Sequence, residues 1–313
     1  MFSLVIPVFR NEGSIPRLLE TLEALNRSME GDLEVVFVVD GSPDRSLEAL
    51  SQALPGRSFA GQLLVLSRNF GSFAAIAAGL AHAQGPLYAV MAADLQEPPE
   101  LMLEFRKRLL AGDCEVVIGT RARRSDPLLS RIISALFWRA YRLFVQREVP
   151  PGGVDVFGCT ELFRDQLLAL RERNTTLVGL VFWLGFARAE VPYARQPRQE
   201  GRSGWSLARR LRYLLDSTFA FSDLPIRLLS LAGLIGLLLA GLLGVLVAWA
   251  RLRGDIQVPG YAATVLVVMF FGALNSLGIG ILGEYLWRTF ENTKGRPGYV
   301  VARHRRFGAA AGA

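Results

Sequence analysis

The sequence predicts an α/β protein in which a mostly parallel sheet is followed by a helical membrane hairpin. Two observations lead to this prediction. Apolar strand-like runs alternate with helix-like segments through residues 1–119, which is typical of a parallel, doubly wound sheet. Farther along the 313-residue chain, two long runs contain no charged residue, one between Arg227 and Arg251 and one between Asp255 and Glu284. Each run exceeds the roughly 20 residues that a membrane-spanning helix requires.

Five strands and four helices make up the predicted sheet domain. The strands are expected at residues 2–9, 33–40, 63–66, 88–93 and 115–119, and the helices at 14–25, 46–54, 73–83 and after the prolines at 98–99. We expect Ser14 to cap the first helix, residues 120–125 to follow the sheet ahead of a helix pattern that contains Arg131, and residues 198–205 to form a polar loop.

Polar side chains stand after three of these strands, at Asp40, Asn69 and Asp94. The carboxyl ends of parallel strands share one edge of a sheet, and open α/β sheets bind ligands there, so these side chains should line one crevice. A carboxylate such as Asp94 suits Mg²⁺ or Mn²⁺ bound to a diphosphate. The alternative is an aspartate that caps the next helix. The sequence contains neither a P-loop nor a dinucleotide-binding glycine motif.

The net charge of +7 is concentrated beside the uncharged runs. Their connection holds only Arg251 and Arg253, next to Asp255, so the positive-inside rule places both ends of the hairpin in the cytoplasm, at the inner membrane. Anionic lipid headgroups therefore explain the basic charge better than nucleic acid does. The flanking basic residues are Arg209, Arg210, Arg212 and Arg227 before the first run, and Arg288, Lys294, Arg296, Arg303, Arg305 and Arg306 after the second.

These patterns divide the chain into four parts. Residues 1–204 form the sheet domain, and residues 205–225 form an amphipathic helix, either in the membrane interface or on an ordinary protein surface. Residues 226–284 hold two transmembrane helices, at about 228–250 and 257–283, and residues 285–313 form a basic tail that we expect to be disordered after Arg306. Small residues permit close packing of the membrane helices, including packing between copies in a homo-oligomer; they are Gly233, Gly236, Gly241 and Gly244.

Cysteine and histidine are too sparse to suggest a metal centre or a catalytic triad. The two cysteines, Cys114 and Cys159, lie in apolar or small-residue settings, and we expect them to be reduced and structural. The two histidines, His82 and His304, lie far apart in the sequence. The predicted site therefore depends on carboxylates, amides and arginines.

Several motifs, taken in order, resemble those of a known family. They are Ile-Pro-Val-Phe-Arg-Asn-Glu at 6–12, Val-Asp-Gly-Ser at 39–42, Ser-Arg-Asn-Phe-Gly at 67–71, Ala-Asp-Leu-Gln at 93–96 and Arg-x-x-Gly-x-Ser at 198–203. Together with the two C-terminal spans, they resemble the polyprenyl-phosphate glycosyltransferases of glycosyltransferase family 2, which have a GT-A fold. This family includes the dolichol-phosphate mannose synthases and the bacterial enzymes that load a sugar onto undecaprenyl phosphate.

The resemblance implies an inverting transfer of a sugar from a UDP- or GDP-linked donor to a polyprenyl phosphate of the undecaprenyl type, at the cytoplasmic face of the membrane. It also implies residue roles. Asp94 and Asp155 would be catalytic, and Asp94 and Gln96 would hold Mg²⁺ or Mn²⁺. The donor nucleotide would contact Pro7, Phe9, Glu12, Asp40 and Arg68, and the acceptor phosphate would contact Arg121, Arg131, Arg198 and Ser203.

The chain departs from the family pattern at the donor site. Val39 and Ala92 stand where the family usually has aspartates, and Gly204 stands where it often has a lysine. The resemblance therefore implies weakened metal binding or an unusual donor. The alternative to an enzyme is a catalytically inactive, membrane-tethered protein that binds a sugar nucleotide or a lipid phosphate. A processive polysaccharide synthase would carry a Gln-x-x-Arg-Trp motif and further spans, which this sequence does not show.

Overall fold

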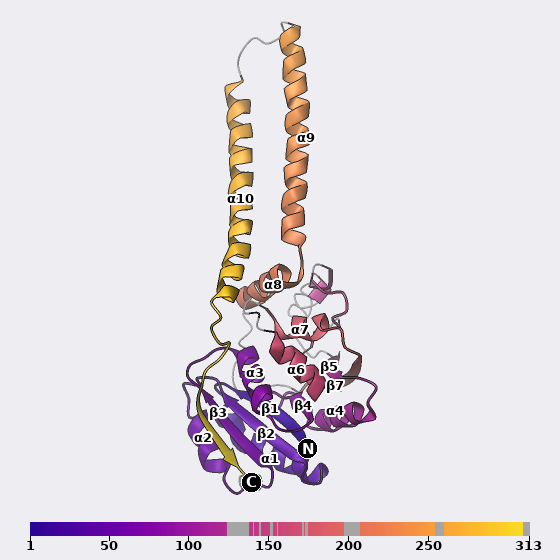
Figure 1. Cartoon of the computed structure of the whole chain (residues 1–313), viewed down its shortest axis with the longest axis vertical. Helices are drawn as coiled ribbons and strands as arrows, with labels where there is room; N and C mark the ends of the chain where they lie inside the picture. Colours follow the sequence, from indigo (N-terminus) through magenta and orange to yellow (C-terminus); the bar gives the residue numbers. More distant parts are fainter. Residues whose placement is uncertain are drawn as a thin grey trace. The chain divides into compact units, whose positions relative to one another are not determined.

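The chain folds into two compact units, which are described separately (Figure 1). One unit comprises Met1–Leu214 and Arg296–Ala313, and the other comprises Leu215–Gly295. The computed structural model describes residues 1–123, 138–139, 141–143, 145–150, 153–154, 156–170, 172, 175–196, 207–253 and 260–308.

The first unit is built on an eight-stranded sheet with the strand order β7-β5-β6-β4-β1-β2-β3-β8. The central strands β4, β1, β2 and β3 are parallel, β5 and β7 are parallel, and β6 and β8 pair with their neighbours in antiparallel fashion. The strands are β1 (Phe2–Val8), β2 (Leu33–Val39), β3 (Ala60–Leu66), β4 (Leu87–Val90), β5 (Val116–Arg123), β6 (Phe157–Thr160), β7 (Arg188–Ala194) and β8 (Val301–Phe307).

Helices cover both faces of the sheet, because successive side chains of a buried strand point to opposite faces. On one face, Leu4 and Ile6 of β1 join a core with the apolar sides of α1 (Ile15–Ser28), α2 (Ser46–Ala53) and α4 (Glu100–Ala111). On the other face lies α3 (Ser72–His82), whose Gly79 leaves no room for a Cβ beside Val5. Other described helices of this unit include η1 (Glu12–Ser14), α6 (Glu161–Ala169) and α7 (Leu177–Trp183).

The predicted α/β class and the order of the first five strands are confirmed, with differences in detail. The fourth strand ends at Val90, and β5 runs on to Arg123, so residues 120–123, which were expected to follow the sheet, belong to its fifth strand. Ser14 precedes α1 but makes no side-chain cap; its hydroxyl donates to the Asn11 carbonyl at 3.0 Å. The short strands β6 and β7 were not predicted, because each depends on pairing with distant residues.

The C-terminal segment is part of the sheet. Instead of continuing as a tail, residues Val301–Phe307 form β8 and pair antiparallel with β3, so that Gly61 lies opposite Phe307. An edge strand exposes unpaired backbone groups, and β8 satisfies those of β3. The expectation of disorder directly after Arg306 is therefore wrong for Phe307, which packs against the core.

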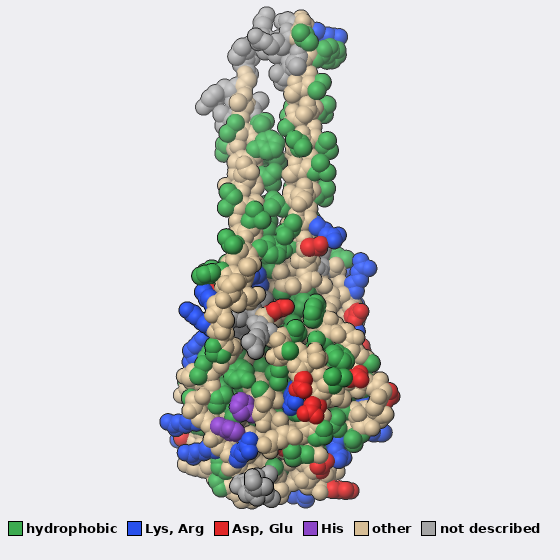
Figure 2. Space-filling model, in the orientation of Figure 1, with side chains coloured by type: hydrophobic (Ala, Val, Ile, Leu, Met, Phe, Trp, Pro, Cys, Tyr) green, Lys and Arg blue, Asp and Glu red, His purple; other side chains and the backbone are tan. Residues whose placement is uncertain are grey.

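The second unit is a helical hairpin of α9 (Leu224–Leu252) and α10 (Tyr261–Thr293), preceded by the last part of α8 (Leu207–Phe221). Within the described residues, Leu224–Leu246 and Val267–Thr293 are long and apolar enough to cross a membrane. Apolar side chains are exposed along both helices (Figure 2), as expected for surfaces that face lipid rather than a protein core.

Two glycines allow the hairpin helices to approach each other. A Cβ at Gly236 in α9 would lie 3.1 Å from Phe271, and a Cβ at Gly278 in α10 would lie 3.5 Å from Leu229. A Cβ at Gly233, Gly241 or Gly244 would meet no atom within 4 Å among the described residues. Of the four small residues singled out in the sequence, only Gly236 therefore serves packing within the hairpin.

Candidate active site

The parallel central strands bring four loops to one edge of the sheet, as predicted. Each loop follows a strand: residues 9–14 follow β1, residues 40–46 follow β2, residues 67–71 follow β3 and residues 91–99 follow β4. The residues predicted to contact the donor nucleotide lie on these loops, except for Pro7, which lies near the end of β1. We call this edge the candidate site.

Asp40 fixes the third loop to the second. Its side chain is 2% exposed, and its two carboxylate oxygens accept hydrogen bonds from the backbone N–H groups of Phe70 at 2.7 Å and Gly71 at 2.8 Å. In return, Asn69 Nδ2 donates to the Asp40 carbonyl at 3.0 Å. Backbone N–H groups at the start of a helix favour a negative charge, so Asp40 orders the entrance to α3.

Gly41 is required where these two loops touch. Its φ is +57°, in the left-handed region that glycine adopts without strain. A Cβ at this position would lie only 2.4 Å from the backbone nitrogen of Asn69. The Asp-Gly pair of the motif at 39–42 thus has a structural reason, independent of any ligand.

A second carboxylate, Asp44, joins the first loop to the second. Asp44 accepts from the Ser42 hydroxyl at 2.6 Å and from the backbone N–H groups of Glu12 at 3.1 Å and Ser46 at 3.3 Å. Burial alone would raise the pKa of Asp44, but these hydrogen bonds outweigh burial and hold the pKa below its usual value. Sequence reasoning missed Asp44, whose signal was its position in a Ser-x-Asp turn.

The predicted nucleotide contacts on the first loop have different environments. Pro7 is half-buried in β1, whereas the Phe9 ring is 41% exposed and lies under the Arg10 guanidinium at 5.4 Å. Glu12 is paired with Arg45, whose Nη2 lies 2.9 Å from Glu12 Oε1. The exposed Phe9 is the side chain here that is free to stack on a planar base.

Arg68 lies on the third loop, at the same edge of the sheet as the first loop. Its guanidinium stacks on the Phe70 ring at 4.0 Å, and Nη1 donates to the Asn69 carbonyl at 3.1 Å. The cation is therefore held at the entrance to α3, beside Asp40.

The fourth loop presents Asp94. After β4, Leu95 adopts a left-handed φ of +53°, which turns the chain sharply between Asp94 and Gln96. The buried carboxylate of Glu97 braces this turn by accepting from the Ala92 N–H at 3.3 Å. Asp94 itself is half-buried, as expected for a carboxylate at the rim of a crevice.

Gln96 is engaged by a residue that sequence reasoning missed. Its Oε1 accepts from Arg195 Nη2 at 2.5 Å, and its backbone carbonyl accepts from the Gln196 N–H at 2.9 Å. Arg195 follows β7, so no local pattern links it to the Asp94 loop. Arg195 lies three residues before Arg198, which is the first residue of the last motif. This position is the feature of the sequence that could have identified it.

The acceptor residues are only partly covered by the described structure. Arg121 is half-buried in β5, opposite Tyr193 of β7. The other predicted acceptor-side and catalytic residues lie outside the described residues; they are Arg131, Asp155, Arg198 and Ser203.

A divalent metal must be tested against the side chains at this edge. Within the described part of the chain, no group of three His, Cys, Asp or Glu side chains gathers as a ready-made cage. Mg²⁺ in phosphate-binding enzymes uses one or two carboxylates together with substrate phosphates. Asp94 alone therefore fits a metal that the donor diphosphate also binds. Gln96 fits less well, because its amide oxygen already faces a guanidinium.

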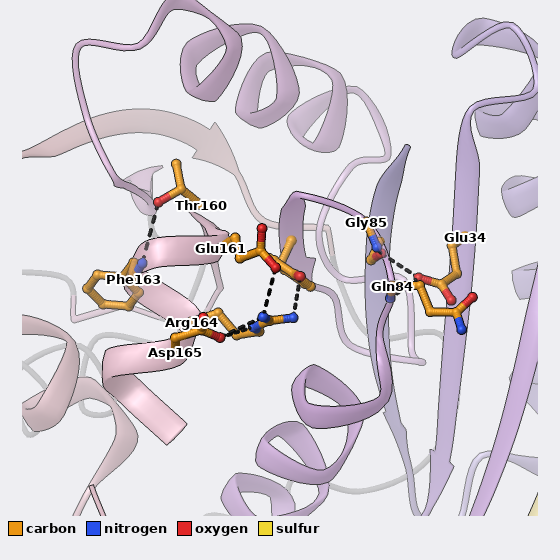
Figure 3. A network of polar contacts seen from close by, with 10 residues as sticks. Glu34, Gln84, Gly85, Thr160, Glu161, Phe163, Arg164 and Asp165 are labelled. Carbon is orange, nitrogen blue, oxygen red and sulfur yellow. Dashed lines mark hydrogen bonds and ion pairs between the residues drawn. The ribbon is translucent and has the colours of Figure 1, made fainter. Parts of the chain in front are cut away.

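A buried polar network lies at the opposite end of the strands (Figure 3). Glu34, near the start of β2, accepts from the Ser3 hydroxyl at 2.5 Å, from Gln62 Nε2 at 2.7 Å and from the Gln84 N–H at 2.8 Å. Three donors compensate one buried carboxylate, so this group serves the fold and not the candidate site.

Arg164 belongs to that opposite end as well. The guanidinium pairs with Glu161 and Asp165 (Figure 3), stacks on the Tyr88 ring at 4.7 Å and donates to the Tyr88 hydroxyl. Burial raises the pKa of Tyr88 to about 12, although Arg164 acts in the other direction. These contacts give a structural role to Arg164, which lies close in sequence to the Asp155 segment.

Comparison with known proteins identifies the family. A model of Glycosyl transferase family 2 matches residues 3–170, which include all four loops of the candidate site. The chain belongs to glycosyl transferase family 2. The predicted family, its α/β GT-A fold and the glycosyltransferase class of enzyme are therefore confirmed.

Relatives of this glycosyltransferase match nearly its whole length. It is 36% identical to the undecaprenyl-phosphate 4-deoxy-4-formamido-L-arabinose transferase of Pseudomonas paraeruginosa, over 97% of this chain and 90% of the relative. It is 30% identical to the prophage bactoprenol glucosyl transferase homolog of Escherichia coli, over 96% of this chain and 98% of the relative.

A solved structure supports the fold. The glucosyl-3-phosphoglycerate synthase of Mycobacterium tuberculosis, crystallised with Mn²⁺ and UDP-glucose, is similar with a TM-score of 0.51 and 17% sequence identity. The similarity covers 70% of this chain and 78% of the synthase. At this identity, the comparison establishes a shared architecture.

Proposed function

We propose that this glycosyltransferase transfers a sugar from a nucleoside-diphosphate donor to the phosphate of a polyprenyl lipid, at the cytoplasmic face of the inner membrane. The observation that carries the proposal is the extent of the similarity. Relatives named for transfer to undecaprenyl phosphate and for bactoprenol glucosyl transfer match the hairpin as well as the sheet domain. A polyprenyl tail cannot leave the bilayer, so the enzyme that modifies its headgroup needs a membrane anchor.

The acceptor needs little chemical activation. A phosphate monoester has a second pKa of about 6, so its oxygen is already anionic at neutral pH. In the transfer, that oxygen forms a bond to the anomeric carbon, the bond to the donor's β-phosphate breaks, and its electron pair stays on the leaving diphosphate. An in-line attack of this kind inverts the anomeric centre. His82 lies in α3 and His304 lies in β8, so neither histidine is on the Asp94 loop. This agrees with a reaction that requires no histidine base.

The protein's contribution is then positioning and charge stabilisation. We assign the donor nucleotide to the edge formed by Pro7, Phe9, Glu12, Asp40 and Arg68. Phe9 offers an exposed ring for the base, while Asp40 acts indirectly by ordering the neighbouring loop. Glu12, being paired with Arg45, supports the first loop.

We assign the divalent metal to Asp94. A bound Mg²⁺ or Mn²⁺ would neutralise the negative charge that gathers on the departing diphosphate. The half-buried Asp94 carboxylate would hold it at the rim. Arg121, Arg131, Arg198 and Ser203 are the proposed contacts of the acceptor phosphate, and Asp155 is proposed to stabilise positive charge on the sugar.

Val39 and Ala92, which stand where the family usually has aspartates, have different environments. Val39 is 1% exposed and packs in the apolar core, so a carboxylate there would lie beneath the candidate site. Ala92 is half-buried on the Asp94 loop itself. The loss at Ala92 therefore bears more directly on metal binding, and it is the main support for a catalytically inactive binding protein.

A transfer assay tests the proposal. The full chain in detergent is given radiolabelled UDP- and GDP-sugars with undecaprenyl phosphate, in the presence of Mg²⁺, Mn²⁺ or EDTA. We expect lipid-linked label from one donor, and dependence on the metal would support the Asp94 assignment. Label that resists EDTA would contradict the metal assignment alone. No label from any donor, in folded protein, would favour the inactive binding protein.

A further inference from the structure

Arg195 is held against the loop that carries Asp94. Although two strands separate β7 from β4 in the sheet, Arg195 Nη2 reaches Gln96 Oε1 at 2.5 Å. The next residue, Gln196, adds two contacts to Gln96: its N–H donates to the Gln96 carbonyl at 2.9 Å, and its own carbonyl accepts from Gln96 Nε2 at 3.4 Å. One hydrogen bond therefore holds the guanidinium at the candidate site, and two more hold the adjacent backbone there.

Arg195 lacks a counter-ion within the described structure. Its side chain is half-buried, its Nε is fully buried and finds no acceptor among the described residues, and its one polar partner there is the neutral amide of Gln96. Two other half-buried arginines of the same unit are paired with carboxylates: Arg164 with Asp165, and Arg188 with Glu148. A partly desolvated cation without a counter-ion is unfavourable, and an anionic ligand would relieve that cost.

We propose that Arg195 binds the diphosphate of the sugar-nucleotide donor, with Gln96 as its positioning partner. The proposal rests on the donor class proposed above. Gln96 occupies one Nη2 hydrogen and leaves the outer hydrogens of the guanidinium for a phosphate oxygen. Arginine suits this task, because its planar, permanently charged fork matches phosphate geometry. The cation is held on the loop that carries Asp94, where a second, protein-borne positive charge would complement a metal held by one carboxylate.

This role also explains why Gln96 and Arg195 occur together. A glutamine amide can hold a guanidinium without cancelling its charge, whereas a carboxylate at position 96 would form an ion pair and compete with phosphate. The substitution Gln96→Glu should therefore weaken diphosphate binding while keeping the contact to Arg195. Arg195→Gln removes the charge and keeps a side chain that can hydrogen-bond to Gln96.

Nucleotide affinities measured by calorimetry on the full chain in detergent test the proposal. The probes are UDP, UMP and uridine, and GDP, GMP and guanosine. The informative quantity is the ratio of diphosphate to nucleoside affinity, because it isolates the phosphate contacts from the base contacts. We expect Arg195→Gln to reduce this ratio by about tenfold to a hundredfold, in keeping with loss of a charge-assisted hydrogen bond.

Control variants separate binding from positioning and from folding. Arg188→Gln removes a paired arginine of β7, the strand that Arg195 follows, and should leave the ratio unchanged, while Arg195→Lys should restore part of it. If Arg195→Lys lowers the ratio as far as Arg195→Gln, the positive charge is not what binds the diphosphate and the proposal is overturned. An unchanged ratio in folded Arg195→Gln also overturns it. If the wild-type chain binds no nucleoside diphosphate, the donor class itself fails.

Discussion

Two aspartates that look alike in the sequence have different roles at the residue scale. Both carboxylates of the motifs at 39–42 and 93–96 follow a central strand. Both oxygens of Asp40 accept hydrogen bonds from backbone N–H groups of the neighbouring loop, whereas Asp94 lies half-buried at the rim, just before the left-handed residue Leu95. The structure thus favours Asp94 as the residue that acts on the donor, and Asp40 as the residue that shapes the site.

Substitution of Asp94 by alanine should abolish most sugar transfer. Removing the carboxylate removes the proposed anchor of the metal, and loss of one preorganised electrostatic contact costs about a hundredfold to a thousandfold in rate. The measurement is the initial rate of lipid-linked label formation with the donor that the wild-type enzyme accepts. Asp94→Asn should behave similarly, because the amide keeps the shape but not the charge.

The control for this experiment is Asp113→Ala, which removes an exposed aspartate between α4 and β5 and should leave the rate unchanged. Recovery of Asp94→Ala in the membrane fraction, with wild-type thermal stability, would separate loss of chemistry from loss of folding. Full activity in Asp94→Ala would mean that the metal is held elsewhere.

At the scale of single elements, β8 links two histidines that are distant in the sequence. The rings of His82 and His304 meet edge to face at 5.3 Å (Figure 2). His304 Nε2 lies 2.7 Å from Gln62 Oε1; the Gln62 amide nitrogen donates to Glu34, so His304 is the donor of this bond. Burial, followed by His82 and Arg306, lowers the pKa of His304 below its usual value of 6.5.

A lowered pKa makes the attachment of β8 sensitive to acid. Below about pH 6.5 the unfolded chain binds a proton that the folded chain resists, so the stability contributed by neutral His304 is lost as the pH falls. We expect the wild-type melting temperature to drop more than that of His304→Gln when the pH is lowered from about 7.5 to about 5.

The matched control is Arg303→Gln, the preceding residue of β8, which leaves His304 in place. This variant should keep the wild-type pH dependence. Identical acid sensitivity in the wild type and in His304→Gln would show that His304 does not couple β8 to pH.

At the scale of the whole molecule, the pairing of β8 with β3 constrains membrane topology. Residues on both sides of the hairpin belong to the same unit, and we therefore propose that the hairpin enters and leaves the bilayer on one side. The strand pairing and the charge distribution around the two runs favour the same topology. At about 1.5 Å per residue, the 29-residue α9 is long enough to span the hydrocarbon core.

Cysteine labelling in intact cells tests this topology. Leu252, at the end of α9, is 87% exposed, and Gly308 follows β8. A membrane-impermeant maleimide should label Leu252→Cys from outside the inner membrane, but Gly308→Cys only after permeabilisation. The native Cys114 and Cys159 are buried and should give little background. Labelling of both positions from the same side would contradict a spanning hairpin.

Much of this architecture could be predicted because it depends on local patterns. Apolar runs in alternation with helical segments identify a parallel sheet, and a parallel sheet places Asp40, Asn69 and Asp94 at one edge whatever their distance in the sequence. The uncharged runs similarly identify the hairpin, because the cost of burying charge in lipid is a property of composition. The family motifs add the class of reaction.

Tertiary structure alone decided the features that join distant residues. The contact of His304 with Gln62 spans 242 positions, and that of Arg195 with Gln96 spans 99. The edge position of β8, the structural role of Asp40 and the uncompensated charge of Arg195 all depend on which segments meet across the sheet. Sequence periodicity reports the face that a residue presents, but not the partner that it meets there, because that partner is chosen by the packing of the whole chain.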